Sequence, residues 1–113
     1  MTRVLIKDFL KPPKETSAST RPQGRRVRQF MLKNWPEVDQ FTVMFEEGLR
    51  ATISFMDEAF AKILDKYTID EFAKKVRFDN LSEYNVLLLG KAVINRLAHK
   101  SNSTGRNKHK AKE

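Results

Sequence analysis

Three short stretches of the chain have the apolar, β-branched pattern that is typical of strands. The first covers residues 3–9 and is stopped by two adjacent prolines. The second, residues 41–45, combines aromatic and β-branched side chains, and Gly48 marks its end. The third, residues 76–78, is shorter. We therefore expect three strands, separated along the chain by segments with a different periodicity.

Between these strands, apolar residues recur at the three- and four-residue spacing of an α-helix. One such segment covers residues 24–34, where Val27, Phe30 and Met31 share a face, and Pro36 ends it. The next helix is predicted over residues 54–66. Its apolar face consists of Phe55, Ala59, Phe60, Ile63, Leu64 and Tyr67. We expect these side chains in the core.

Two further helices are predicted toward the end of the chain. Thr68 and Glu71 have the spacing of a capping box that starts a short helix, and Ser82 opens the last helix. The apolar positions of this last helix are Val86, Leu89, Val93, Ile94 and Leu97. Leu87 and Leu88 make it more apolar than one buried face requires, so we expect either a monomer or a dimer formed through this helix. Either leucine could equally be buried under the sheet.

The resulting order, β-α-β-α-β-α, favours a small layered α/β domain with a mainly parallel sheet, because parallel strands need crossover connections between them. A chain of 113 residues has room for one such core. We assign the domain to residues 1–99. The remaining segment, residues 100–113 (KSNSTGRNKHKAKE), is polar and cationic and is predicted to be a disordered tail.

The net charge is +8, and the excess of lysine and arginine lies at the two ends of the chain. The predicted tail could contact nucleic-acid phosphates, as could a basic patch formed by Arg21, Arg25, Arg26 and Arg28. Arg25 and Arg28 are about one helical turn apart, so they could grip a phosphate or an acidic partner together. The plainer interpretation is a solvated helix face with apolar residues buried behind it.

The composition argues against several classes of protein. No apolar run reaches the length of about 18 residues that crosses a bilayer, and the N-terminal sequence lacks the features of a signal peptide. We therefore expect a cytoplasmic protein without membrane contact. There are no cysteines, which excludes disulfides and thiolate metal sites.

Catalytic side chains are equally scarce. His99 and His109 are the only histidines, and both lie at or beyond the end of the last predicted helix, where a base or a metal ligand would lack fixed geometry. The glycines stand alone and form no phosphate-binding loop. We expect neither an enzyme nor a bound metal or cofactor.

The start of the 54–66 helix combines a serine with two carboxylates. Ser54 and Asp57 fit a capping box, in which the serine oxygen accepts a backbone N–H and the carboxylate reaches back to the start of the helix. Asp57 and Glu58 also suit the positive end of the helix dipole. They point about 100° apart on a helix, so they do not form a catalytic pair of carboxylates. Capping explains all three polar residues, and a binding site is the alternative.

Several of these segments resemble the STAS-like family, small domains named for their similarity to the sulfate-transporter and anti-sigma-factor-antagonist fold. Residues 45–48 (FEEG) and 53–60 (ISFMDEAF) are similar to the family's sequences DFEGV and SFADELFGKL. Residues 76–83 (VRFDNLSE) are similar to its segment IKFKNLSE before the last helix. The resemblance extends over residues 3–98.

The resemblance implies a non-enzymatic protein-interaction module of a signalling or regulatory pair. The start of the 54–66 helix would then dock a partner ATPase of the histidine-kinase type. The residues that this contact would use are Thr52, Ser54, Phe55, Asp57 and Glu58.

In the anti-sigma-factor antagonists, a serine at the start of the corresponding helix is phosphorylated. Ile53 occupies that position here, so only Ser54 or Thr52 could serve after a one-residue change of register, and Ser54 is the candidate phosphorylation site. The alternative function is a nucleic-acid-associated protein that uses the arginine patch and the basic tail. The two functions differ in their expected response to salt, because phosphate binding weakens steeply as the salt concentration rises.

Overall fold

The chain folds around a three-stranded parallel sheet, as predicted, in a computed structural model that describes residues 2–11 and 14–112, with side chains up to His99. The strands β1 (Thr2–Leu5), β2 (Phe41–Met44) and β3 (Val76–Asp79) lie in the order β1-β2-β3. The first strand is shorter than expected, because Ile6–Phe9 forms a 3₁₀ helix, η1, that turns the chain away from the sheet.

The first long helix, α1 (Arg21–Asn34), begins three residues earlier than the apolar pattern indicated. Its start is set by a capping box between Thr20 and Gln23, in which each side chain accepts a backbone N–H of the other residue. A 3₁₀ turn, η2 (Trp35–Glu37), follows the helix and contains the proline that was expected to end it.

The predicted 54–66 helix is divided in two. The structure has a short α2 (Ile53–Ala59) followed by a 3₁₀ helix, η3 (Ala61–Asp65). The break occurs at Phe60, whose backbone leaves the helical conformation at φ −124° and ψ −50°. The apolar stripe nevertheless stays on one side, because Phe60, Ile63 and Leu64 are also buried.

Two predicted helix starts are confirmed. Thr68 and Glu71 form the expected capping box at the start of α3 (Ile69–Lys75). The Ser82 hydroxyl accepts the N–H of Asn85 in the first turn of α4 (Glu83–Lys112).

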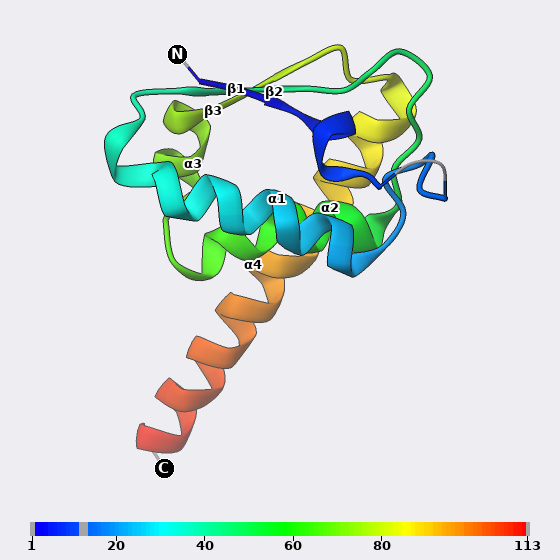
Figure 1. The fold of residues 1–113 in the computed structure, drawn as a ribbon. Coiled ribbons are helices and arrows are strands. Elements are labelled where there is room, and N and C mark those ends of the chain that lie inside the picture. Colours follow the sequence, from blue (N-terminus) through cyan, green and yellow to red (C-terminus); the bar gives the residue numbers. More distant parts are fainter. Residues whose placement is uncertain (1, 12–13, 113) are drawn as a thin grey trace.

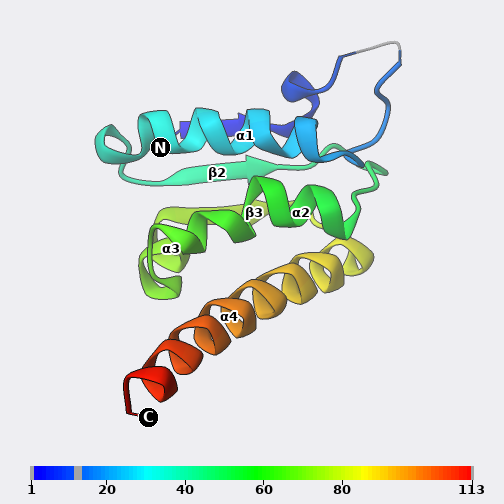
Figure 2. The same cartoon turned by 90° about the horizontal axis from the view of Figure 1, so that it is seen from below.

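The helices lie on one side of the sheet (Figure 1). Helices α1 and α2 lie next to the strands, and α4 lies against α2 on the side opposite α1 (Figure 2). This arrangement follows from the strand order. Both crossovers step across the sheet in the same direction, and crossovers of one hand then lie on the same face. No helix of the described residues covers the opposite face of the sheet.

Aromatic side chains fill the space between the sheet and the helices, as predicted. The rings of Phe45, Phe55 and Phe60 contact one another, with Phe55 and Phe60 centroids 6.1 Å apart. Trp35 is buried and stacks on Tyr67 with a centroid separation of 4.6 Å. The aromatic side chains bury a large apolar area in these contacts, and this burial stabilises the domain.

The buried face of α4 differs from the prediction. Leu88 and Ala92 are buried against the domain, whereas Val86 is 50% exposed and Ile94 is 66% exposed. The predicted stripe was wrong at these last two positions, because α4 has apolar residues on most sides and spacing alone does not select the buried face. Leu87 is also exposed, and a dimer through this helix stays a prediction.

The backbone of α4 continues through the predicted tail as far as Lys112, although no side chains are described beyond His99, and the assignment of residues 100–113 as a separate disordered tail stays a prediction.

Candidate functional site

The start of α2 is held in place by Thr52, which is the N-cap residue of the helix. Its hydroxyl oxygen accepts the N–H of Phe55 at 3.1 Å and donates to the carbonyl oxygen of Ser19 at 2.9 Å. The prediction that Ser54 caps this helix was wrong, because the helix starts at Ile53 and places Ser54 inside its first turn. Thr52 therefore joins the β2–α2 loop to the segment that precedes α1.

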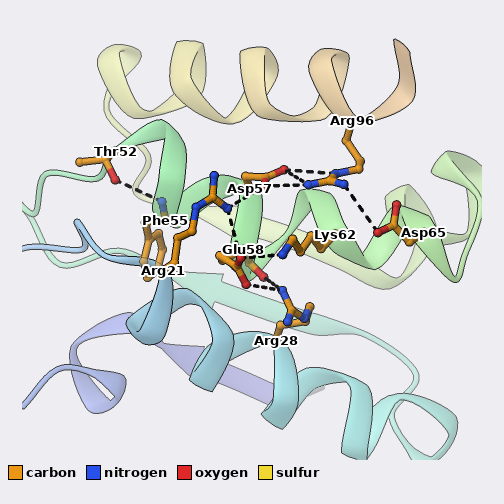
Figure 3. Close-up of polar contacts among 9 residues, drawn as sticks. All are labelled: Arg21, Arg28, Thr52, Phe55, Asp57, Glu58, Lys62, Asp65 and Arg96. Atoms are coloured by element: carbon orange, nitrogen blue, oxygen red, sulfur yellow. Dashed lines mark hydrogen bonds and ion pairs between the residues drawn. The ribbon is translucent and has the colours of Figure 1, made fainter. Parts of the chain in front are cut away.

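Glu58 lies between α1 and α2 and is the most buried carboxylate among the described residues, with 2% of its surface exposed. Its side chain accepts from Arg28 at 2.8 Å, from Lys62 at 2.6 Å and from Arg21 at 3.1 Å (Figure 3). Burial by itself would raise the pKa of Glu58, but the hydrogen bonds from Lys62, Arg28 and Arg21 outweigh it and lower the pKa to about 2. The carboxylate is therefore charged at neutral pH.

Asp57 lies on the opposite side of α2 and joins three helices. Arg96 of α4 contacts both of its oxygens, at 2.8 and 2.9 Å, and Arg21 of α1 contacts it at 2.9 Å (Figure 3). Burial would raise the pKa of Asp57, but the hydrogen bonds from Arg21 and Arg96 lower it. The hydrogen bonds from Arg21 to the carboxylates of Asp57 and Glu58 raise the pKa of Arg21. The prediction that Asp57 reaches back to the helix start was wrong, since its carboxylate points to these arginines.

The four arginines of the predicted anion patch do not form one surface. Arg21 and Arg28 bind the carboxylates of α2, and Arg26 binds Glu15 at 3.1 Å and the carbonyl oxygen of Phe9. Arg25 is exposed, and no partner is present for it within the described part of the chain. Arg25 and Arg28 therefore do not grip a common ligand, because the Arg28 side chain is turned inward to Glu58.

A groove of about 310 Å³ lies between the start of α2, the start of α1 and α4. Ile53, the first residue of α2, is 39% exposed and contributes an apolar side chain to it. Asp57 and its two arginines form part of the wall. The residues around the groove are Arg21, Ile53, Asp57, Ala92, Asn95, Arg96 and His99.

The five residues that the sequence analysis assigned to partner contact differ in how far they are exposed. Phe55 is fully buried and Glu58 nearly so, so both support the surface from behind. Thr52 and Ser54 are half-buried. Asp57 is the one member of the predicted set that lines the groove.

Three features of the site were missed by the sequence analysis. The sequence analysis considered Ile53 only as the residue at the position of a phosphorylated serine, and it did not place Ile53 in a groove. It did not pair Arg96 with Asp57, which is 39 residues away in the chain. No pattern among neighbouring residues indicated either feature. Lys62 is four residues after Glu58, and this spacing on a helix could have indicated an ion pair.

Metal and membrane sites find no support in the described residues. No group of three or more metal-ligating side chains comes together among them. None of the helices, over the same residues, combines the length and the apolar character that a bilayer crossing needs.

Comparison with known proteins identifies the domain type. A family model described as a STAS-like domain of unknown function (DUF4325) matches residues 23–86, which is more than half of the chain. The comparisons with curated proteins and with solved structures gave no match. The matched segment runs from the first turn of α1 to the first turn of α4 and includes the start of α2 with its carboxylates. The chain therefore belongs to this family of STAS-like domains.

Proposed function

We propose that this domain is a non-catalytic protein-interaction module of a regulatory pair, and that it docks its partner at the groove beside the start of α2. The observation that carries the proposal is the exposure of Ile53 at the first position of α2, inside a groove with fixed charged walls. Arginine is enriched among the residues that contribute most binding energy in protein interfaces, and an exposed apolar side chain beside it adds apolar area that a partner can bury.

The groove is held in one shape by contacts that do not depend on a partner. Asp57 ties the helices α1, α2 and α4 together through Arg21 and Arg96. Glu58 ties α1 to α2 from within the domain. A preformed surface loses little conformational entropy when it binds, which favours affinity.

The class of partner comes from the likeness to the anti-sigma-factor antagonists. We propose an ATPase of the histidine-kinase type, in the cytoplasm, as the docked protein. The nucleic-acid alternative has less support, because Arg21, Arg26 and Arg28 are engaged by carboxylates of the same chain.

The test is affinity purification of the intact protein from its own cells, followed by mass spectrometry, after nuclease treatment and at high salt. We expect one ATPase to survive both treatments, because an apolar contact is insensitive to salt. Ribosomal proteins or nucleic acid that disappear on treatment would support the alternative instead.

The groove itself is tested by the variant Ile53→Asp, with Ile69→Asp as a matched control. Each isoleucine is the first residue of a short helix after a threonine N-cap, and their exposures are 39% and 41%. We expect Ile53→Asp to abolish recovery of the ATPase and Ile69→Asp to retain it. Equal recovery with both variants would show that the groove is not the docking surface.

Phosphorylation at Ser54 stays a prediction, and two variants separate it from simple docking. Ser54→Ala removes the acceptor hydroxyl, and Ser54→Asp adds a negative charge beside Asp57. A phosphoswitch requires that Ser54→Asp lose the partner while the fold is unchanged and Ser54→Ala keeps it. Normal binding by both variants would exclude the switch.

A further inference from the structure

The face of the sheet opposite the helices is uncovered, which is unusual for parallel strands. Parallel sheets are normally covered on both faces, because their crossovers place helices on each side. Here the strands follow chain order, and the helices lie on one side only (Figure 1). The other side is therefore a surface that the described part of the chain does not use.

The side chains on this outer face follow from the strand alternation. Phe41 and Val43 are fully buried on the inner side, which places Thr42 and Met44 on the outer side. The register aligns Thr42 with Arg3 of β1 and Arg77 of β3. Two exposed arginines thus stand on either side of a central threonine.

Neither arginine is neutralised by a side chain that the structure describes. Arg3 and Arg77 are exposed and make no hydrogen bond or ion pair with any residue that the structure describes. Neighbouring strands are about 4.8 Å apart, so the two side chains start roughly 10 Å from each other and are long enough to converge on one group. Arg3 and Arg77 therefore differ from Arg21, Arg26 and Arg28, which already form ion pairs within the domain.

The threonine between them has an unsatisfied hydroxyl. Thr42 is 4% exposed, and its Oγ1 atom has no hydrogen-bond partner among the described residues. A buried hydroxyl normally finds a partner, because leaving it without one costs free energy. The hydroxyl is buried, so a ligand oxygen would accept from it once the side chains over Thr42 move aside, and it would accept from the guanidinium groups as well.

The next row of side chains indicates what kind of ligand fits. Leu5 and Met44 are half-buried apolar residues, and Asp79 completes their row on β3. Asp79 repels negative charge in its own row, so an acidic group is favoured only in the row of the two arginines, and a continuous run of phosphates is disfavoured. No outward-facing strand residue that the structure describes is aromatic, so bases have nothing there on which to stack. A single acidic side chain next to apolar side chains suits a protein better than a nucleic acid.

We propose that the outer face of the sheet binds an acidic segment of a partner protein. A glutamate or aspartate side chain of that segment pairs with Arg3 and Arg77 and accepts from the Thr42 hydroxyl, while apolar side chains rest on Leu5 and Met44. This surface is distinct from the groove at Ile53, on the opposite side of α1 and α2.

The test is an NMR titration of the isotopically labelled full chain with a peptide of alternating glutamate and leucine residues. We expect shifts of the amides in β1, β2 and β3, and loss of these shifts in the double variant Arg3→Glu/Arg77→Glu. The matched control, Arg25→Glu/Lys33→Glu, has the same change of charge at exposed positions of α1 and should keep them. Equal loss with both double variants would overturn the proposal, because it would show general charge attraction.

A second variant distinguishes recognition from structure. Thr42→Val removes the unsatisfied hydroxyl and keeps the shape, so the fold should be retained or stabilised while peptide affinity falls by about tenfold. Unchanged affinity would contradict a role for the hydroxyl. Preferential shifts of the strand amides with a single-stranded oligonucleotide would overturn the choice of a protein ligand. Ile53→Asp should leave peptide binding intact, so failure of the groove proposal would be recognised separately.

Discussion

Gly24 of α1 lies against Glu58 of α2 so closely that a Cβ atom on Gly24 would stand 2.8 Å from the Cβ atom of Glu58. The same added atom would be 2.8 Å from the carbonyl oxygen of Phe55. The absence of a side chain at this point lets α1 and α2 approach, and this approach brings Arg28 within reach of the Glu58 carboxylate. The ion pair between Arg28 and Glu58 therefore depends on this glycine.

Replacement of this glycine should destabilise the fold. We expect Gly24→Ala to lower the free energy of unfolding by about 1–3 kcal/mol, because backbone atoms of α2 must move to make room. Alanine is the better helix former, so propensity alone predicts the opposite sign. The measurement is urea denaturation followed by circular dichroism.

Gly90→Ala in α4 is the matched control. A Cβ atom there meets nothing within 4 Å, so the variant should gain about 0.5–1 kcal/mol from helix propensity. A stabilised Gly24→Ala variant would show that the two helices are not in close contact at this point.

Removal of the charge at Glu58 should be costly as well. Glu58→Gln keeps the shape but leaves Arg28 and Lys62 without their carboxylate, and we expect a loss of about 2–3 kcal/mol in the free energy of unfolding. Asp65→Asn is the control, since its contact with Arg96 is 3.7 Å long and half-exposed, and it should cost less than about 0.5 kcal/mol. Similar losses in both variants would argue against a special role for the buried carboxylate.

The same carboxylates make stability depend on pH. The pKa of Glu58 is lowered from its usual 4.5 to about 2, and that of Asp57 is also lowered, so both bind protons less readily in the folded state than in the unfolded state. Their contribution is complete above the unfolded pKa values and is lost as the pH falls toward 2. Denaturation midpoints measured between about pH 7 and pH 2.5 should begin to fall below about pH 4.5. In Glu58→Gln this fall should be shallower, and an identical pH profile would contradict the assignment.

The helix cap at the start of α2 can be tested by removing the hydroxyl of Thr52 and that of Ser54 in two separate variants. Thr52→Ala removes the acceptor for the Phe55 N–H and should cost about 0.5–2 kcal/mol. Ser54→Ala lies inside the first turn and should change the free energy of unfolding by less than about 0.5 kcal/mol. Both free energies of unfolding are measured by chemical denaturation. A larger loss in Ser54→Ala than in Thr52→Ala would show that Ser54 is the cap after all.

Most of the fold could be predicted from local patterns. The strands at residues 41–44 and 76–79 and the capping box of α3 were recognised because apolar spacing and cap residues act over a few positions. The buried side of α4 could not be predicted, since Leu88 and Ile94 are equally apolar and only packing selects one of them. The break at Phe60 had no local signal, because the apolar stripe continues through it.

The candidate site was located only in part. The sequence pointed to the start of α2 through its family resemblance, and Asp57 does line the groove there. Phe55 and Glu58 were assigned to partner contact, but their burial depends on how α1 and α4 pack on α2. Arg96, which completes the site, comes from a distant helix.

The sequence by itself determined the element order, the parallel sheet and the family of this domain, because periodicity, caps and short motifs are encoded in neighbouring residues. Only the tertiary structure decided which charges are paired and which stay free. Arg28 is neutralised by Glu58, whereas Arg77 is left exposed on the uncovered face of the sheet. The physical reason is that an ion pair depends on distance in space, and distance between residues far apart in the chain is set by packing.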